Sequence, residues 1–292
     1  MATLLSVGFA GGATAAQQKY TYGWQYTAGQ VLRYHYTSHQ AGVQGATTAV
    51  ARLATMFRNG VGGSRVRWTA LTVDGQNLDS VARAYPPYEV SLDPADPKLN
   101  IPKATIPATL QNPVDGLLTI LVGLNPIIGI DQLHQAGTSY TYPHPLIGNF
   151  RNSTTPVGRD ATRLTSTLKA LTASNATFQS TFWRPRQSDL KLSRSWMASP
   201  VCGTTPNNFE LVQSADGGYV ALWGCEFFAV TTTVDRTTGH IISAVQHDSL
   251  HVDGRFCPTI ALTSCTAIPA SSEETIYKLN ALPTPAASTR AG

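Results

Sequence analysis

Charged side chains are scarce in this sequence. Asp, Glu, Lys and Arg make up 13% of the 292 residues, about half of the share usual in globular proteins. The formal net charge is +4, and no segment is rich in Lys and Arg, so we expect no nucleic-acid partner. Thr, with 36 residues, supplies much of the polar character instead. Its β-branched side chain favours strands.

Familiar catalytic and nucleotide-binding motifs are also lacking. The sequence has no nucleophile elbow, P-loop, zinc-protease helix or dinucleotide fingerprint. Asp131, His134 and His144 form a weak acid/base candidate, since a spacing of three puts the first two on one helix face. His247 and His251 would lie roughly 13 Å apart in a strand, too far for one metal ion. We therefore expect no metal or cofactor, and an enzyme is less favoured than a binding protein.

Cysteine is missing from the first two thirds of the chain. Cys202, Cys225, Cys257 and Cys265 all lie in the last third. An even number of cysteines predicts two disulfides formed in an oxidising compartment. A zinc site is disfavoured because no pair has the close Cys-x2–4-Cys spacing. Of the three pairings available, Cys202–Cys225 with Cys257–Cys265 is favoured because each closes a short loop.

The N-terminus has the pattern of a signal peptide. A short apolar stretch, Leu4 to Ala10, is followed by small residues that predict cleavage near Ala15 or Ala16. No basic residue precedes the apolar stretch, so we expect that Met1 lies downstream of the true start. An ordinary first strand is the alternative. Residues 1–16 are thus predicted to be a targeting segment of a periplasmic or secreted protein.

Alternating apolar and polar residues predict that 17–283 form a single β-rich domain. Tyr20, Tyr22, Trp24 and Tyr26 alternate with small or polar residues, which predicts a strand, and Leu32, Tyr34 and Tyr36 share one face of the next stretch. Asn59-Gly60 and Asp74-Gly75 are expected turns of a meander. Further strands are predicted at 46–58, 65–73, 162–171, 176–183, 219–233, 240–252 and 274–282. Residues 284–292 are expected to be a disordered tail.

One segment, 113–134, is the most apolar part of the predicted domain. Seven prolines between residues 84 and 113 predict a looping connection before it. Asn112 is expected to cap a helix with Pro113 at its first position, and Asn125-Pro126 to end it. The segment is too short and too broken to span a membrane. A helix that is apolar on all sides must be buried or must cover something apolar.

The run from Tyr22 to Tyr36, YGWQYTAGQVLRYHY, carries the one resemblance to known families. It resembles the first strands of an uncharacterised family of exported bacterial β-rich proteins. More loosely, it is similar to the β modules of lipid carriers and to the half-barrels of lipoprotein-localisation factors. That resemblance implies a curved antiparallel sheet wrapped around short helices or lipid. It covers about 50 residues and identifies no functional residue.

These patterns predict a mainly β protein, with a large curved antiparallel sheet or partly closed barrel and short apolar helices, about 113–134, on its concave face. The favoured function is non-catalytic binding of a lipid, another apolar molecule or an envelope partner in a concave pocket. The alternatives are a structural or interaction protein of the cell surface with no cavity, and a hydrolase with an unrecognised site. Oligomeric state stays open. The expected ligand-binding residues are Leu32, Tyr34, Tyr36, Trp68, Leu117, Leu121, Leu124 and Ile128.

Overall fold

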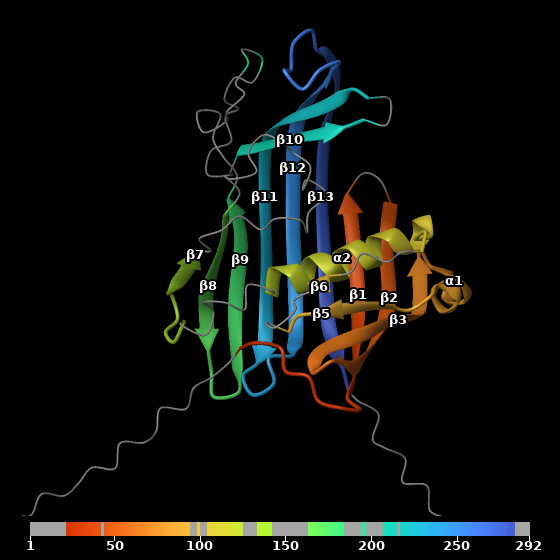
Figure 1. Ribbon diagram of the computed structural model, residues 1–292, viewed down its shortest axis with the longest axis vertical. Coiled ribbons are helices and arrows are strands. Elements are labelled where there is room, and N and C mark those ends of the chain that lie inside the picture. Colours follow the sequence, from red (N-terminus) through yellow and green to blue (C-terminus); the bar gives the residue numbers. More distant parts are fainter. Residues whose placement is uncertain are drawn as a thin grey trace, which may run out of the picture.

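The described residues fold into one large open antiparallel sheet with two helices (Figure 1). The computed structural model describes residues 22–41, 44–93, 98–99, 104–124, 133–141, 163–183, 194, 196, 207–214 and 217–283. The predicted targeting segment 1–16 and tail 284–292 lie outside these residues. The mainly β, curved antiparallel fold expected from the sequence is confirmed, and the sheet is open rather than closed.

The sheet has 13 strands in the order β6-β5-β3-β2-β1-β13-β12-β11-β9-β8-β7, with β4 beside β3 and β10 beside β11. The strands are β1 (Val31–Ala41), β2 (Gln44–Arg58), β3 (Val61–Val73), β4 (Gln76–Asn77), β5 (Tyr88–Ser91), β6 (Lys98–Leu99), β7 (Ser139–Thr141), β8 (Arg163–Leu171), β9 (Asn175–Trp183), β10 (Asn207–Gln213), β11 (Tyr219–Asp235), β12 (Ile241–Cys257) and β13 (Thr266–Leu282). The helices are α1 (Asp79–Ala84) and α2 (Ala108–Leu124).

Local turn chemistry builds the meander β1–β2–β3. Asn59 and Gly60 have φ values of 51° and 83°, and Asp74 and Gly75 have 51° and 80°. Two successive residues with positive φ make the turn whose twist matches a hairpin, and Asn-Gly and Asp-Gly tolerate it best. The pairing of β1 with β13 is different in kind, because it joins the two ends of the sequence: Tyr36 lies opposite Leu279.

Residues 22–27 differ from their predicted strand conformation. They follow an irregular path across the β11–β12 turn, where the amide of Gln25 donates to the carbonyl of Thr238 at 2.8 Å. Gly239 has φ of 67°, and a Cβ atom there would collide with the backbone of Gly23. Tyr22 and Trp24 are nevertheless buried. The alternation of these aromatic residues with small or polar ones therefore reflects packing of an irregular segment on the core. Tyr20 lies outside the described residues.

The predicted start of the apolar helix was also wrong. Helix α2 begins at Ala108, which places Pro113 inside it rather than at its first position. Leu110 is completely buried, so packing of this earlier turn offsets the backbone hydrogen bond that Pro113 cannot donate. The described helix reaches Leu124, and Asn125-Pro126, where it was predicted to end, lie outside the described residues. The proline-rich connection before it contains the short strands β5 and β6.

The cysteine predictions are confirmed where the structure describes them. Cys257 and Cys265 form a disulfide that closes the loop between β12 and β13. Cys225 is also disulfide-bonded. Cys202, its expected partner, lies outside the described residues. A second, smaller core of Ala221, Trp223, Cys257 and Leu262 packs around the Cys257–Cys265 bridge.

Candidate functional site

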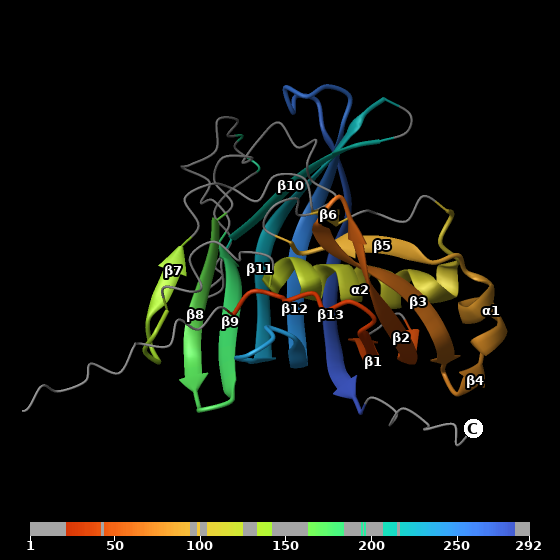
Figure 2. The same cartoon turned by 60° about the horizontal axis from the view of Figure 1, so that its bottom comes forward.

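The inner face of the sheet is the face that contacts α2. Figure 2 shows α2 between β1–β3 in front and β11–β13 behind, and the helix contacts β1, β2, β11 and β12. Strand alternation directs Tyr34 and Tyr36 of β1 to this face, and both are at most 1% exposed. Trp68 of β3 lies beside Tyr36, with ring centroids 6.2 Å apart in an edge-to-face arrangement. The curved sheet therefore presents an aromatic surface to the helix.

Helix α2 approaches Tyr36 very closely. A Cβ atom at Gly116 would overlap the Tyr36 ring and hydroxyl, so the absence of a side chain at this position permits the contact. The Tyr36 hydroxyl lies 2.8 Å from Oδ1 and 3.1 Å from the carbonyl oxygen of Asn112. This tyrosine thus fastens the first half of α2 to the sheet by a polar contact within an otherwise apolar interface.

Most of the predicted ligand-binding residues meet in one cluster. Tyr34, Tyr36, Trp68, Leu117 and Leu121 are buried in the main core, and Leu32 packs against it half-buried. They belong to the same core as α2, and Tyr36 contacts the helix directly at Asn112 and Gly116. The side chain of Leu124 and the whole of Ile128 lie outside the described part of the chain.

Three tyrosine hydroxyls of this core donate to backbone or side-chain oxygens far away in the sequence. Besides Tyr36, Tyr22 donates to the carbonyl of Leu133 at 3.1 Å and Tyr34 to the carbonyl of Ile241 at 3.2 Å. Burial raises the pKa of Tyr34 and of Tyr36 above the usual phenol value of 10.0. The hydroxyls of Tyr34 and Tyr36 therefore stay protonated at neutral pH, where they position the chain as donors and cannot act as general bases.

We expect these buried tyrosines to make the fold sensitive to alkali. The pKa of Tyr34, Tyr36 and Tyr88 is raised by burial in the folded state. Their stabilising contribution is thus complete below about pH 10 and is lost as pH rises, because only the unfolded chain ionises readily. Between about pH 10 and 11 each should lower the free energy of unfolding by roughly 1 kcal/mol. Urea unfolding followed by circular dichroism across this range tests it.

The control for this prediction is Tyr34→Phe, whose free energy of unfolding should fall less steeply with pH than that of the wild type. Phenolate absorbance should rise together with the loss of structure. A stability that stays constant up to about pH 11, or phenolate absorbance that appears while the sheet is still folded, would contradict the burial argument.

A polar group that the sequence did not predict lies on the same inner face, beside the aromatic surface. Gln246 of β12 is 3% exposed, and its Oε1 has no hydrogen-bond partner among the described residues. Thr275 of β13 is opposite Asp248 of β12. Glu273 accepts hydrogen bonds from Gln40 at 2.6 Å and from Thr275 at 3.0 Å. Gln40, Gln246, Asp248, Glu273 and Thr275 are called the inner polar patch below.

The sequence held a signal for this patch. Ala244, Gln246 and Asp248 follow a period of two, so polar residues replace apolar ones on an inward-facing strand face. His247 faces outward, where its Nε2 lies 3.0 Å from Oε1 of Glu274. Its ring also meets Phe227 edge-on.

The weak acid/base candidate is not assembled by the described residues. His134 is exposed, and Asp131 and His144 lie outside the described part. Within the described ranges, no group of three or more His, Cys, Asp or Glu side chains could hold a metal ion. No helix there is long and apolar enough to cross a membrane.

The site is therefore an aromatic inner face, covered by one apolar helix and bordered by a polar patch. Comparison of the sequence with models of protein families and with curated proteins finds no match.

Proposed function

We propose that this protein is a non-catalytic binding protein of the bacterial envelope that holds an apolar ligand between α2 and the inner face of its sheet. The observation that carries the proposal is the apolar helix enclosed by a curved aromatic face. Concave apolar surfaces with a few polar groups are the usual form of small-molecule sites. The Cys257–Cys265 disulfide is compatible with an extracellular or periplasmic protein.

Helix α2 has the properties of a displaceable cover. Pro113 and Gly116 lie inside it, and interior Pro and Gly cost about 3 and about 1 kcal/mol relative to Ala. Such a helix is held by its packing rather than by its own propensity. An apolar ligand that offers an equivalent surface can replace the sheet as the partner of Leu117 and Leu121. The Tyr36–Asn112 contact then acts as a latch.

The inner polar patch supports an amphiphile as the ligand class. Buried polar groups without partners are costly, and a ligand that pairs with them recovers this cost. The unpartnered Oε1 of Gln246 lies on the same sheet face as the aromatic surface. We therefore expect a molecule with an apolar tail beside α2 and a hydrogen-bond donor near Gln246.

A structural protein without a ligand is the second candidate. Leu117 and Tyr36 are completely shielded from solvent, as in a solid core. The two candidates differ in whether α2 can leave the sheet while the sheet stays folded.

Native mass spectrometry of protein purified from its own envelope should reveal a bound lipid-sized adduct. After removal of the adduct, a fluorescent fatty acid should bind. In Tyr36→Phe the latch is lost, which lowers the cost of opening by about 1 kcal/mol. The apparent affinity should therefore rise up to about fivefold.

Tyr34→Phe is the matched control. It removes a hydroxyl from the same strand face that donates to Ile241 of β12 and not to α2. Its stability should fall by a similar amount while its affinity stays unchanged. If no adduct is found and the fatty acid fails to bind all three proteins, the carrier proposal is wrong and the structural candidate is favoured.

A further inference from the structure

Three arginines that are far apart in the sequence come together on the outer face of the sheet, the face turned away from α2. Arg33 of β1 lies directly opposite Arg52 of β2, and Arg52 lies directly opposite Arg67 of β3. Arg52 and Arg67 are exposed, and Arg33 is half-buried. Neighbouring strands are ~4.8 Å apart, so the backbones that carry these three side chains span only about 10 Å. They are called the arginine row below.

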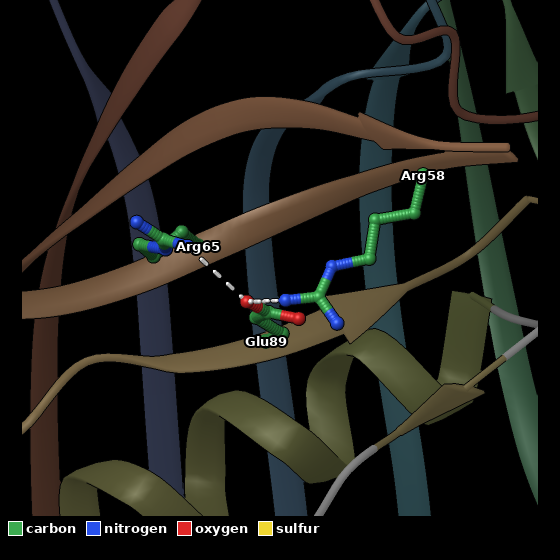
Figure 3. A network of polar contacts seen from close by, with 3 residues as sticks. All are labelled: Arg58, Arg65 and Glu89. Atoms are coloured by element: carbon green, nitrogen blue, oxygen red, sulfur yellow. Dashed lines mark hydrogen bonds and ion pairs between the residues drawn. The ribbon is translucent and has the colours of Figure 1, made fainter. Parts of the chain in front are cut away.

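The arginine row has no ion-pair partner in the described part of the chain. Across the described residues, no carboxylate forms an ion pair with Arg33, Arg52 or Arg67. The nearby carboxylate of Glu89 on β5 is already shared between two other arginines. Figure 3 shows it between Arg58, at 2.8 Å, and Arg65, at 3.4 Å. One carboxylate between two arginines leaves a net positive charge in this group of three.

Such a row is unfavourable for the fold itself. Like charges directly opposite each other in adjacent strands destabilise a sheet, and this row has two such pairs. Arginine forms paired hydrogen bonds with phosphate and carboxylate groups. An anionic partner would turn the repulsion between the arginines into attraction, which assigns the row a role in binding rather than in folding.

The shape of the surface decides which kind of anion fits. The row runs across three neighbouring strands, so it suits an extended array of anionic groups better than a single small ion. Arg58 of β2 and Arg65 of β3 alternate in step with Arg52 and Arg67, so they extend the basic surface on the same face. Clusters of basic residues are typical of proteins that attach to an anionic membrane surface.

We propose that the outer face of β1–β3, centred on the arginine row, docks on a membrane surface that contains anionic phospholipids. This face is opposite to the one that contacts α2. The proposal therefore stands whether or not the inner face holds a ligand, and its test does not depend on ligand binding.

The test is sedimentation of the full chain with vesicles of phosphatidylcholine alone or of equal parts phosphatidylcholine and phosphatidylglycerol. The protein should bind the anionic vesicles, and binding should weaken as salt rises. The double variant Arg52→Gln/Arg67→Gln should reduce the partition coefficient for the anionic vesicles about 30-fold, because each arginine contributes a factor of about five. The control Arg83→Gln/Lys169→Gln removes two exposed positive charges on α1 and β8 and should bind as the wild type does.

Stability separates this role from misfolding. Arg52→Gln relieves both repulsive pairs and should raise the Tm by about 1–3 °C, so a loss of binding in a more stable protein cannot come from unfolding. The proposal is overturned if anionic and neutral vesicles bind equally, or if both double variants lose binding equally. It is also overturned if the row is needed for binding to heparin or single-stranded DNA but not to vesicles.

Discussion

Replacement of Leu121 by Asp is expected to release α2 from the sheet while the sheet stays folded. Leu121 is 1% exposed between α2 and the inner face, and an unpaired charge there would be very costly. The strands keep their hydrogen bonds to one another when the helix leaves, because these bonds run between strands and none of them involves α2. Helix departure is therefore the less costly response.

The expected measurements follow from this reason. Far-ultraviolet circular dichroism should keep the strand signal and lose helix content, and the protein should no longer bind a fluorescent fatty acid. Thr109→Asp is the matched control, since it adds the same charge at an exposed position in the first turn of α2, where the helix dipole favours it. It should keep both the helix and the binding.

Two other outcomes are informative. Complete unfolding of Leu121→Asp would show that α2 is an inseparable part of the core, as the structural candidate requires. Unchanged stability and unchanged binding would mean that α2 is neither core nor cover, and the proposed function would lose its main support.

The sequence predicted the features that depend on neighbouring residues. The Asn59-Gly60 turn follows from local backbone preference, and burial of Leu117 and Leu121 follows from an apolar stretch that cannot face water. The start of α2 was missed because local rules place Pro at the first turn of a helix. Here the packing of Leu110 overrides that preference.

The clustering of side chains from different strands depends on strand register and could not be predicted from the sequence. Arg33, Arg52 and Arg67 are separated by 19 and 15 positions in the chain and become neighbours only through the pairing of β1, β2 and β3. The inner polar patch likewise needs β12 beside β13 and β13 beside β1. A shift of one residue in any of these pairings would send these side chains to the opposite face, so their clustering requires the fold.

Replacement of Trp68 by Ala is expected to cause the largest loss of stability among changes that leave no buried charge. Its indole is 1% exposed, meets Tyr36 edge-on and lies beside the Tyr88 hydroxyl. Truncation of a buried Trp typically lowers the free energy of unfolding by about 3–5 kcal/mol, through lost transfer energy and the cavity left behind. Urea unfolding measures this, and Trp68→Phe should lose clearly less because it keeps an aromatic ring against Tyr36.

Trp223→Ala is the control that connects this change to function. Trp223 is also buried, at 3% exposure, but it belongs to the smaller core around Cys257. Both variants should lose comparable stability. Only Trp68→Ala removes apolar surface from the face beneath α2, so it alone should weaken fatty-acid binding, by about tenfold for roughly 1.4 kcal/mol of lost contact. Equal effects of both changes on binding would mean that Trp68 affects the ligand through stability alone, which would contradict a ligand site on the inner face beside Trp68.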